Sequence, residues 1–154
     1  MGQGTYRLLN RTQRVVINND PKLSLFLKKR GHLYLSVNKT ILIPFVSETR
    51  YQLLRDINSY LLKLYKRSSL TKDQRKLIDT IKTNNNSIHY SKRYLLKFKQ
   101  DFFHTDRDHP YGYDWNFYNH NVNFHAQMID YNKEQRTKCA EDLFRSLGGR
   151  FLDE

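Results

Sequence analysis

A stretch dense in aromatic and histidine residues, from Phe102 to Phe124, divides the chain into two parts of opposite charge. Residues 1–100 carry 21 Lys and Arg against 5 Asp and Glu, whereas residues 101–154 carry 6 against 10. Pro110 and Gly112 disfavour regular structure in the middle of the stretch, because proline lacks an amide donor and glycine is costly in a helix. The sequence therefore predicts an irregular aromatic segment between a cationic part and a final helix.

Apolar and polar residues alternate at 33–37 and again at 41–45, which predicts a β-hairpin. Pro44 has no backbone N–H, which favours an edge position for the second strand. Two weaker strand candidates lie earlier in the chain, at 14–17 and 24–27. Residues 1–46 are therefore expected to form a strand or arm region.

Three apolar stripes at helical spacing predict helices within a basic helical region, residues 47–104. The predicted helices cover 47–68, 71–83 and a third range that begins at Ser87 or Ser91 and ends at His104. Thr71 and Gln74 have the spacing of a capping box, in which each side chain bonds the other's backbone N–H. The polar run Asn84-Asn85-Asn86 is expected to end the second of these helices, so that the second and third form a hairpin.

A fourth helix is predicted over 119–147, and Gly148-Gly149 is a typical helix stop. Its apolar residues form a broken stripe: Phe124, Met128, Tyr131, Cys139, Leu143 and Leu147. The chain length of 154 residues suits one domain. We therefore expect a single α+β domain that is mainly α, with an N-terminal hairpin region, about four helices and an extended aromatic loop at 105–118.

The net charge of +12 favours an anionic partner: RNA, anionic lipid headgroups or an acidic protein surface. The cations expected to contact such a partner are Lys28, Lys29, Arg30, Lys66, Arg67, Arg75, Lys76, Lys92 and Arg93. Tyrosines interleave with these cations, a pattern that suits phosphate neutralisation combined with base stacking. The same cations would equally suit a solvated basic surface.

The aromatic segment is expected to pack across another protein, because tryptophan and tyrosine are the residues that most often anchor interfaces. The predicted anchors are Tyr111, Tyr113, Trp115, Phe117 and Tyr118.

Carboxylates and histidines also gather in this segment, but their spacing does not define a metal site. The pairs His104/His109 and His120/His125 are each five residues apart, which on a helix separates the two side chains by about 140°. A loop site built from Asp106, Asp108 and His109 stays open, and so does acid–base chemistry by Asp108 with His109 or Asp114 with His120. We expect neither enzyme activity nor a cofactor, since no nucleophile, phosphate-loop or dinucleotide motif is present.

The residues Asp114-Trp115-Asn116-Phe117, followed by His120, Phe124, Met128, Tyr131, Glu134 and Arg136, resemble the second helix of a twin-helix accessory subunit of respiratory complex I. The match covers roughly two dozen residues and needs one inserted residue after His120. The family carries paired cysteines on both helices, whereas this chain has one cysteine, Cys139, outside the matched positions. The resemblance implies a non-catalytic subunit that stabilises a large membrane complex from outside the bilayer.

These features together predict a structural accessory subunit of a large assembly, most simply a mitochondrial respiratory-chain complex. An RNA-binding or ribosomal protein is the first alternative, and a microtubule-associated ciliary protein is the second. No apolar run approaches the roughly 20 residues that span a bilayer, and the N-terminus has no secretory apolar region. We therefore expect a chain with no transmembrane segment that is not secreted. Gly2 is open to N-terminal modification, although Tyr6 occupies a position where acylation favours Ser or Thr.

Overall fold

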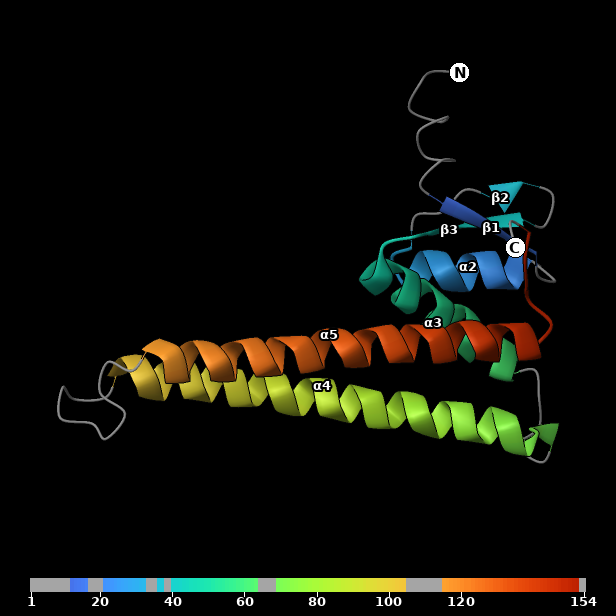
Figure 1. Ribbon diagram of the computed structural model, residues 1–154. Coiled ribbons are helices and arrows are strands. Elements are labelled where there is room, and N and C mark those ends of the chain that lie inside the picture. Colours follow the sequence, from blue (N-terminus) through green and yellow to red (C-terminus); the bar gives the residue numbers. More distant parts are fainter. Residues whose placement is uncertain are drawn as a thin grey trace, which may run out of the picture. The chain divides into compact units, whose positions relative to one another are not determined.

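The computed structural model describes residues 12–16, 21–32, 36–37, 40–63, 69–104 and 115–152. In chain order the elements are β1 (Thr12–Val16), α2 (Pro21–Lys29), β2 (Ser36–Val37), β3 (Thr40–Pro44), α3 (Ser47–Lys63), α4 (Lys72–His104), α5 (Trp115–Ser146) and β4 (Arg150–Phe151) (Figure 1). The predicted class, α+β and mainly α, is confirmed. Within the described ranges, no helix is both long enough and apolar enough to cross a membrane.

The chain forms two compact units. Unit 1 comprises residues 1–80 and 137–154, and unit 2 comprises residues 81–136. The boundary between them falls inside both α4 and α5. The single domain expected from the chain length stays a prediction.

The sheet of unit 1 has four antiparallel strands in the order β2-β3-β1-β4. β2 pairs with β3, which confirms the predicted hairpin. The expected edge position of the second hairpin strand is wrong, because β3 lies between β2 and β1. Pro44 is the last residue of β3, opposite Thr12, and a proline at a strand end interrupts few ladder hydrogen bonds.

Helices α2 and α3 lie on one side of this sheet (Figure 1). The fully buried side chains of unit 1 come from β1, α2, β3, α3 and the last part of α5: Val15, Leu23, Leu27, Ile41, Ile43, Leu54, Ile57 and Phe144. Residues 24–27, predicted as a strand, belong to α2 instead. Leu23 and Leu27 are both fully buried, and their spacing of four places them on one side of a helix. A run this short does not distinguish the two periods by its apolar residues alone.

Two helices of unit 1 end in the same cap. In α5, Gly148 N–H donates to Arg145 O at 3.1 Å and Gly149 N–H donates to Phe144 O at 2.9 Å, the two bonds of a Schellman motif. Gly148 has a φ of 97°, which glycine adopts without strain. The predicted helix end at Gly148-Gly149 is confirmed, and Gly31, with a φ of 81°, closes α2 in the same way.

The helix α4 corrects the expected break at Asn84-Asn85-Asn86, because it continues without interruption from Lys72 to His104. Its start is as predicted: Thr71 N–H donates to Gln74 Oε1 and Gln74 N–H donates to Thr71 Oγ1, at 3.0 and 3.1 Å. Asparagine costs only a few tenths of a kcal/mol more in a helix than most polar residues, so packing outweighs it. The predicted hairpin of two shorter helices therefore does not exist.

The helix α5 begins at Trp115, four residues earlier than predicted. Trp115, Phe117 and Tyr118 are therefore helical rather than part of an extended loop. The rest of that predicted loop, residues 105–114, lies outside the described residues, and so do the predicted anchors Tyr111 and Tyr113.

Candidate functional site

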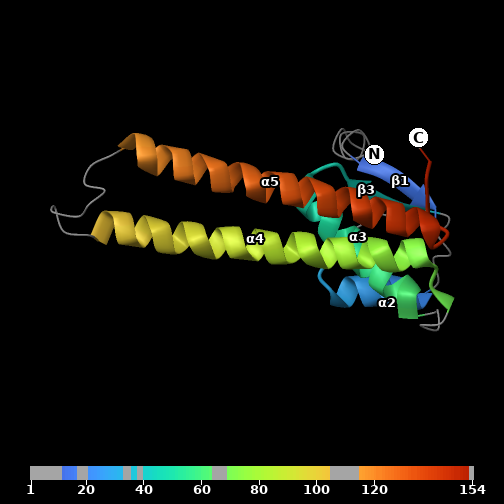
Figure 2. The same cartoon turned by 60° about the horizontal axis from the view of Figure 1, so that its bottom comes forward.

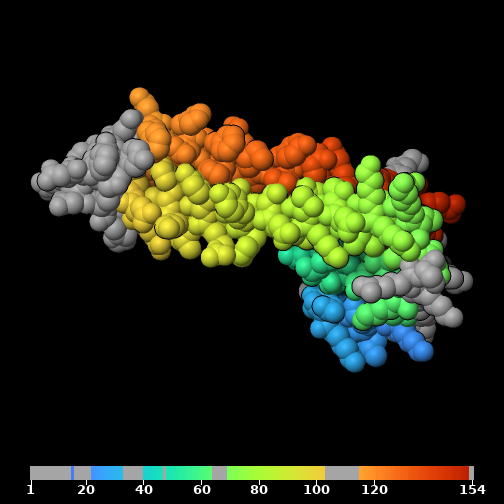
Figure 3. All heavy atoms as spheres, turned by 90° about the horizontal axis from the view of Figure 1, so that it is seen from below, coloured from blue at the N-terminus to red at the C-terminus, as the bar shows by residue number. Residues whose placement is uncertain are grey.

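Unit 2 is an antiparallel helical hairpin of α4 and α5. Arg136 Nη1 donates to Asn85 Oδ1 at 2.9 Å near one end of the pair, and the rings of Phe102 and Trp115 lie 5.7 Å apart near the other. The helices run side by side in both cartoon views, and their side chains meet in the space-filling view (Figures 1, 2 and 3).

Inward-facing positions alternate in steps of three and four on both helices, the heptad spacing of a coiled-coil seam. On α4 they are Ile81, Asn84, Ile88, Ser91, Leu95, Phe98 and Phe102, and on α5 they are Tyr118, Val122, His125, Ile129, Asn132 and Arg136. Every one of these side chains is buried or half-buried. The seam is polar at its centre and aromatic towards the loop end of the hairpin.

The aromatic end of the seam contains the predicted anchors that the structure describes. Phe98 lies 6.0 Å from Phe117 and 5.8 Å from Tyr118, measured between ring centroids, and Phe102 lies 4.6 Å from Tyr118. Phe117 and Tyr118 are therefore half-buried against α4 and help hold the hairpin closed. Trp115 contacts Phe102 and Tyr118 but keeps about half of its surface exposed, at 51%.

A groove of about 420 Å³ opens between the two helices of unit 2. It is lined by Thr83, Asn86, Ser87, Tyr90, Ser91, Phe124, His125, Met128 and Asn132. None of these residues is an aspartate, glutamate, lysine or arginine. The groove is therefore a mixed surface of rings, a thioether, hydroxyls and amides.

Large apolar side chains are exposed along this groove. Tyr90, Phe124 and Met128 line it with exposed fractions of 66%, 51% and 38%. Tyr131, 57% exposed, follows Phe124 and Met128 at helical spacing along α5. These four residues are called the apolar face below. These α5 positions belong to the broken apolar stripe predicted from the sequence, and in unit 2 that stripe is an exposed face.

Two buried polar atoms lie in the seam next to this face. His125 Nδ1 and Asn84 Nδ2 have no hydrogen-bond partner among the residues that the structure describes. The His125 ring stacks on Tyr94 at 4.1 Å between centroids, which fixes its orientation in the groove wall. Asn132, by contrast, uses its amide to donate to Met128 O at 2.8 Å. A buried unpaired polar group costs about 1–3 kcal/mol, so these two atoms lower the stability of the seam.

The predicted cations are divided between the units. Lys28, Lys29, Arg30, Arg75 and Lys76 belong to unit 1, whereas Lys92 and Arg93 belong to unit 2, and all seven are exposed. Lys66 and Arg67 lie outside the described residues. One shared anionic-partner surface for all nine cations therefore stays a prediction.

Within unit 2, four exposed cations lie on the side of α4 that faces away from the groove, whereas exposed Lys97 follows Tyr90 by seven residues and lies on the same side of the helix as Tyr90. Lys82, Lys92, Arg93 and Lys99 are called the basic flank. At about 100° per residue, each lies some 120–140° around the helix from Ser87 in the groove wall. The sequence predicts Lys92 and Arg93 as part of one binding surface in which tyrosines interleave with cations. The pairing of α4 with α5 places Tyr90 and these two cations on different sides of α4.

No group of three or more His, Cys, Asp or Glu that could hold a metal ion occurs in the described ranges. His120 is exposed on α5, and His125 lies in the groove wall. Asp106, Asp108, His109 and Asp114 fall outside the described residues, as does the side chain of His104. The hypothesis of a loop metal or acid–base site is therefore untested.

Comparison of the chain with family models, curated proteins and solved structures gives no match. The resemblance of residues 114–136 to a complex I accessory subunit stays a prediction. The groove and its apolar face are the candidate site, because they combine exposed rings, unpaired buried polar atoms and an uncharged lining.

Proposed function

We propose that this chain is a non-catalytic structural subunit of a multi-subunit assembly, and that it binds a neighbouring protein through the apolar face of unit 2. The observation that carries the proposal is the exposure of Tyr90, Phe124 and Met128 in a groove lined without lysine, arginine, aspartate or glutamate, and of Tyr131 one turn further along α5. Rings and methionine are enriched at protein interfaces, where charged residues are depleted from the centre.

The size of the apolar face supports this proposal. With about 200 Å² for each large side chain, the exposed fractions leave on the order of 400 Å² of the four residues uncovered. Patches of several hundred Å² on a soluble protein commonly mark an interaction site. Only 38% of the residues are hydrophobic, yet these rings are left in contact with water. That exposure costs free energy, and a partner bound over the apolar face would remove the cost.

The finer part of the proposal, a mitochondrial respiratory-chain complex, is supported by the resemblance of residues 114–136 alone. The net charge of +12 is compatible with docking beside anionic lipid headgroups or an acidic subunit.

The test is recovery of the native assembly from cells that express the tagged chain, in mild detergent and with size fractionation. Tyr131→Glu places a charge on the apolar face and is expected to shift the tagged chain to smaller fractions. Leu96→Glu is the matched control, since Leu96 is 62% exposed on α4 but lies opposite Ser87 on the helix. An assembly of unchanged size with Tyr131→Glu would contradict the proposal.

A second candidate function, RNA binding, is favoured by the basic flank. Four exposed cations within about five helical turns could follow a phosphate backbone. Measured with a single-stranded RNA, affinity should fall with salt by about 0.7 log units per log unit of salt for each phosphate contacted. Lys92→Gln should reduce the steepness of that salt dependence by about 0.7, because it removes one phosphate contact. Treatment with RNase should disperse the recovered assembly. Resistance to RNase together with a flat salt response would exclude this candidate.

A further inference from the structure

We propose that the protein covering the apolar face is a second copy of this chain, with two unit 2 hairpins packed face to face about a twofold axis. This inference rests on the proposed function, because it names the neighbour that the apolar face binds. Two paired hairpins form a four-helix arrangement, a common solution for helices with exposed apolar surface.

Charge argues for this occupant. Each copy carries +12, so two copies repel wherever their cations come close. The groove lining has no lysine or arginine, and the basic flank lies 120–140° away around α4. Two copies that meet at the apolar face therefore keep their basic flanks turned outwards. An acidic partner would find no lysine or arginine in the lining, and one exposed cation, Lys97, beside it.

The chemistry of the face suits pairing with itself. A twofold interface brings the same patch together from both copies, so its groups must complement one another. Rings and a thioether meet that condition, since aromatic pairs and sulfur–ring contacts are both favourable. Each face also offers the tyrosine hydroxyls of Tyr90 and Tyr131.

The area predicts a weak dimer. The apolar faces of two copies would together bury on the order of 800 Å², which is below the roughly 1,200 Å² at the lower end of specific interfaces. We therefore expect a dissociation constant in about the micromolar range rather than an obligate dimer.

The experiment is sedimentation equilibrium of the full chain from roughly 1 μM to 1 mM, where a micromolar dimer changes from mostly monomer to mostly dimer. The expected result is a monomer–dimer equilibrium that tightens as salt is raised, because salt screens the repulsion between two cationic copies. A contact made through the basic flank and an anionic group would weaken with salt instead.

Two variants on the same helix make the experiment specific. Tyr90→Glu and Leu96→Glu add the same charge to α4 at positions that are 66% and 62% exposed, about 120° apart around the helix. Tyr90→Glu should weaken dimerisation at least tenfold, whereas Leu96→Glu should leave it unchanged or strengthen it slightly by reducing the net positive charge. Equal helical circular dichroism and equal thermal midpoints would show that both variants fold.

A distance measurement locates the contact. In a Cys139→Ser background, a spin label at Met128→Cys should report a short distance between copies, and a label at Leu96→Cys should report a long one. A dimer with the reverse pattern, or one that Tyr90→Glu leaves intact, would overturn the inference.

The outcomes separate this inference from the proposed function. If the chain is monomeric at all concentrations and Tyr90→Glu still shrinks the native assembly, the apolar face binds a different subunit and only the second-copy inference fails. If the chain is monomeric and Tyr90→Glu leaves the native assembly unchanged, the inference and the proposed function both fail.

Discussion

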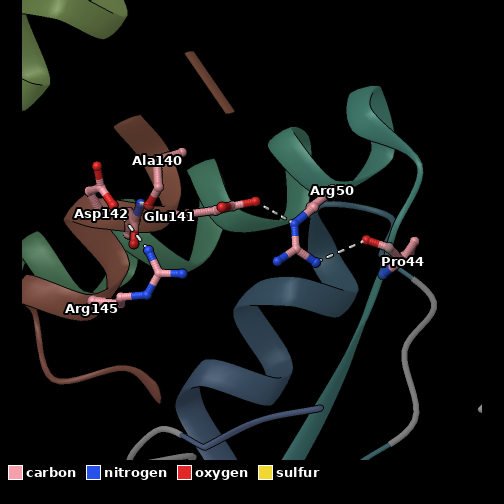
Figure 4. Close-up of polar contacts among 7 residues, drawn as sticks. Pro44, Arg50, Ala140, Glu141, Asp142 and Arg145 are labelled. Carbon is pink, nitrogen blue, oxygen red and sulfur yellow. Dashed lines mark hydrogen bonds and ion pairs between the residues drawn. The ribbon is translucent and has the colours of Figure 1, made fainter. Parts of the chain in front are cut away.

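Arg50 donates from Nε to the Glu141 carboxylate at 2.7 Å, which joins α3 to α5 within unit 1 across 91 positions of sequence (Figure 4). The guanidinium also donates to Pro44 O at 3.3 Å and lies 5.0 Å from the Phe151 ring centroid. Arg50 is buried, so its charge is compensated by a carboxylate, a carbonyl and a ring rather than by water.

Glu141→Gln is expected to lower the free energy of unfolding by about 1–3 kcal/mol, because it removes the charge from a hydrogen bond to a buried guanidinium. The matched control is Asp142→Asn. Asp142 pairs with Arg145 at the surface at 3.0 Å, and exposed pairs contribute about 0–1 kcal/mol. Urea denaturation of both variants measures the difference. Equal losses would show that the Arg50 pair contributes no more than a surface pair.

Neighbouring glycines at the end of α5 should respond differently to alanine. Gly148→Ala forces an alanine into a φ of 97° with open space around its Cβ, so we expect a loss of about 1 kcal/mol. Gly149→Ala places its Cβ against the fully buried ring of Phe144, and such overpacking costs about 1–3 kcal/mol or more. A larger fall in urea midpoint for Gly148→Ala than for Gly149→Ala would contradict this reading of the cap.

Stability should fall in acid partly because of Asp56. Burial raises the pKa of the Asp56 carboxyl, but hydrogen bonds from His32, at 2.5 Å, and from Arg55 outweigh burial and hold the pKa below its ordinary value. A carboxyl with a lowered folded-state pKa stabilises the fold above its unfolded pKa of about 4, and this contribution is lost as pH falls through the folded pKa. The difference in urea midpoint between the wild-type chain and Asp56→Asn should therefore shrink below about pH 4. A difference that stays constant into acid would argue against this assignment.

In unit 2, replacement of asparagine by leucine should stabilise the fold at position 84 and destabilise it at position 85. Asn84→Leu removes a buried amide whose Nδ2 has no partner in the described structure, so a gain of about 1 kcal/mol is expected. Asn85→Leu removes the acceptor for Arg136 and should cost about 1 kcal/mol or more. Thermal unfolding followed by circular dichroism measures both. Destabilisation by Asn84→Leu would indicate that the amide is satisfied by ordered water.

Sequence patterns located most elements but not their partners. The β-hairpin, the capping box at Thr71 and the glycine stop of α5 were all predictable, because each depends on residues within a few positions of one another. The continuity of α4 through Asn84-Asn85-Asn86 was not, since it depends on α5 and on an Arg136 that is 51 positions from Asn85.

The candidate site shows the same division. The spacing of Phe124, Met128 and Tyr131 predicts one helical face, but spacing does not say whether that face is buried or exposed. Here the inward positions are held by Val122, His125, Ile129 and Asn132, so the more apolar stripe is the one left open. The aromatic residues Phe117 and Tyr118, predicted as anchors for a partner, contact Phe98 and Phe102 within the chain, and their role towards a partner stays a prediction.

The order of the sheet has a consequence for synthesis of the chain. Val15 on the inner strand β1 lies opposite Phe151 of β4, and Phe144 in the last turn of α5 and Leu147 just after it are buried in the same unit. Unit 1 therefore cannot close its core while the ribosome is still translating residues 140–151. Unit 2 is contiguous, and all of its residues have been translated once Arg136 is added. During translation, β1 stays without its partner β4 until residues 150–151 have been added. The interval before that addition is the one in which a chaperone would matter most.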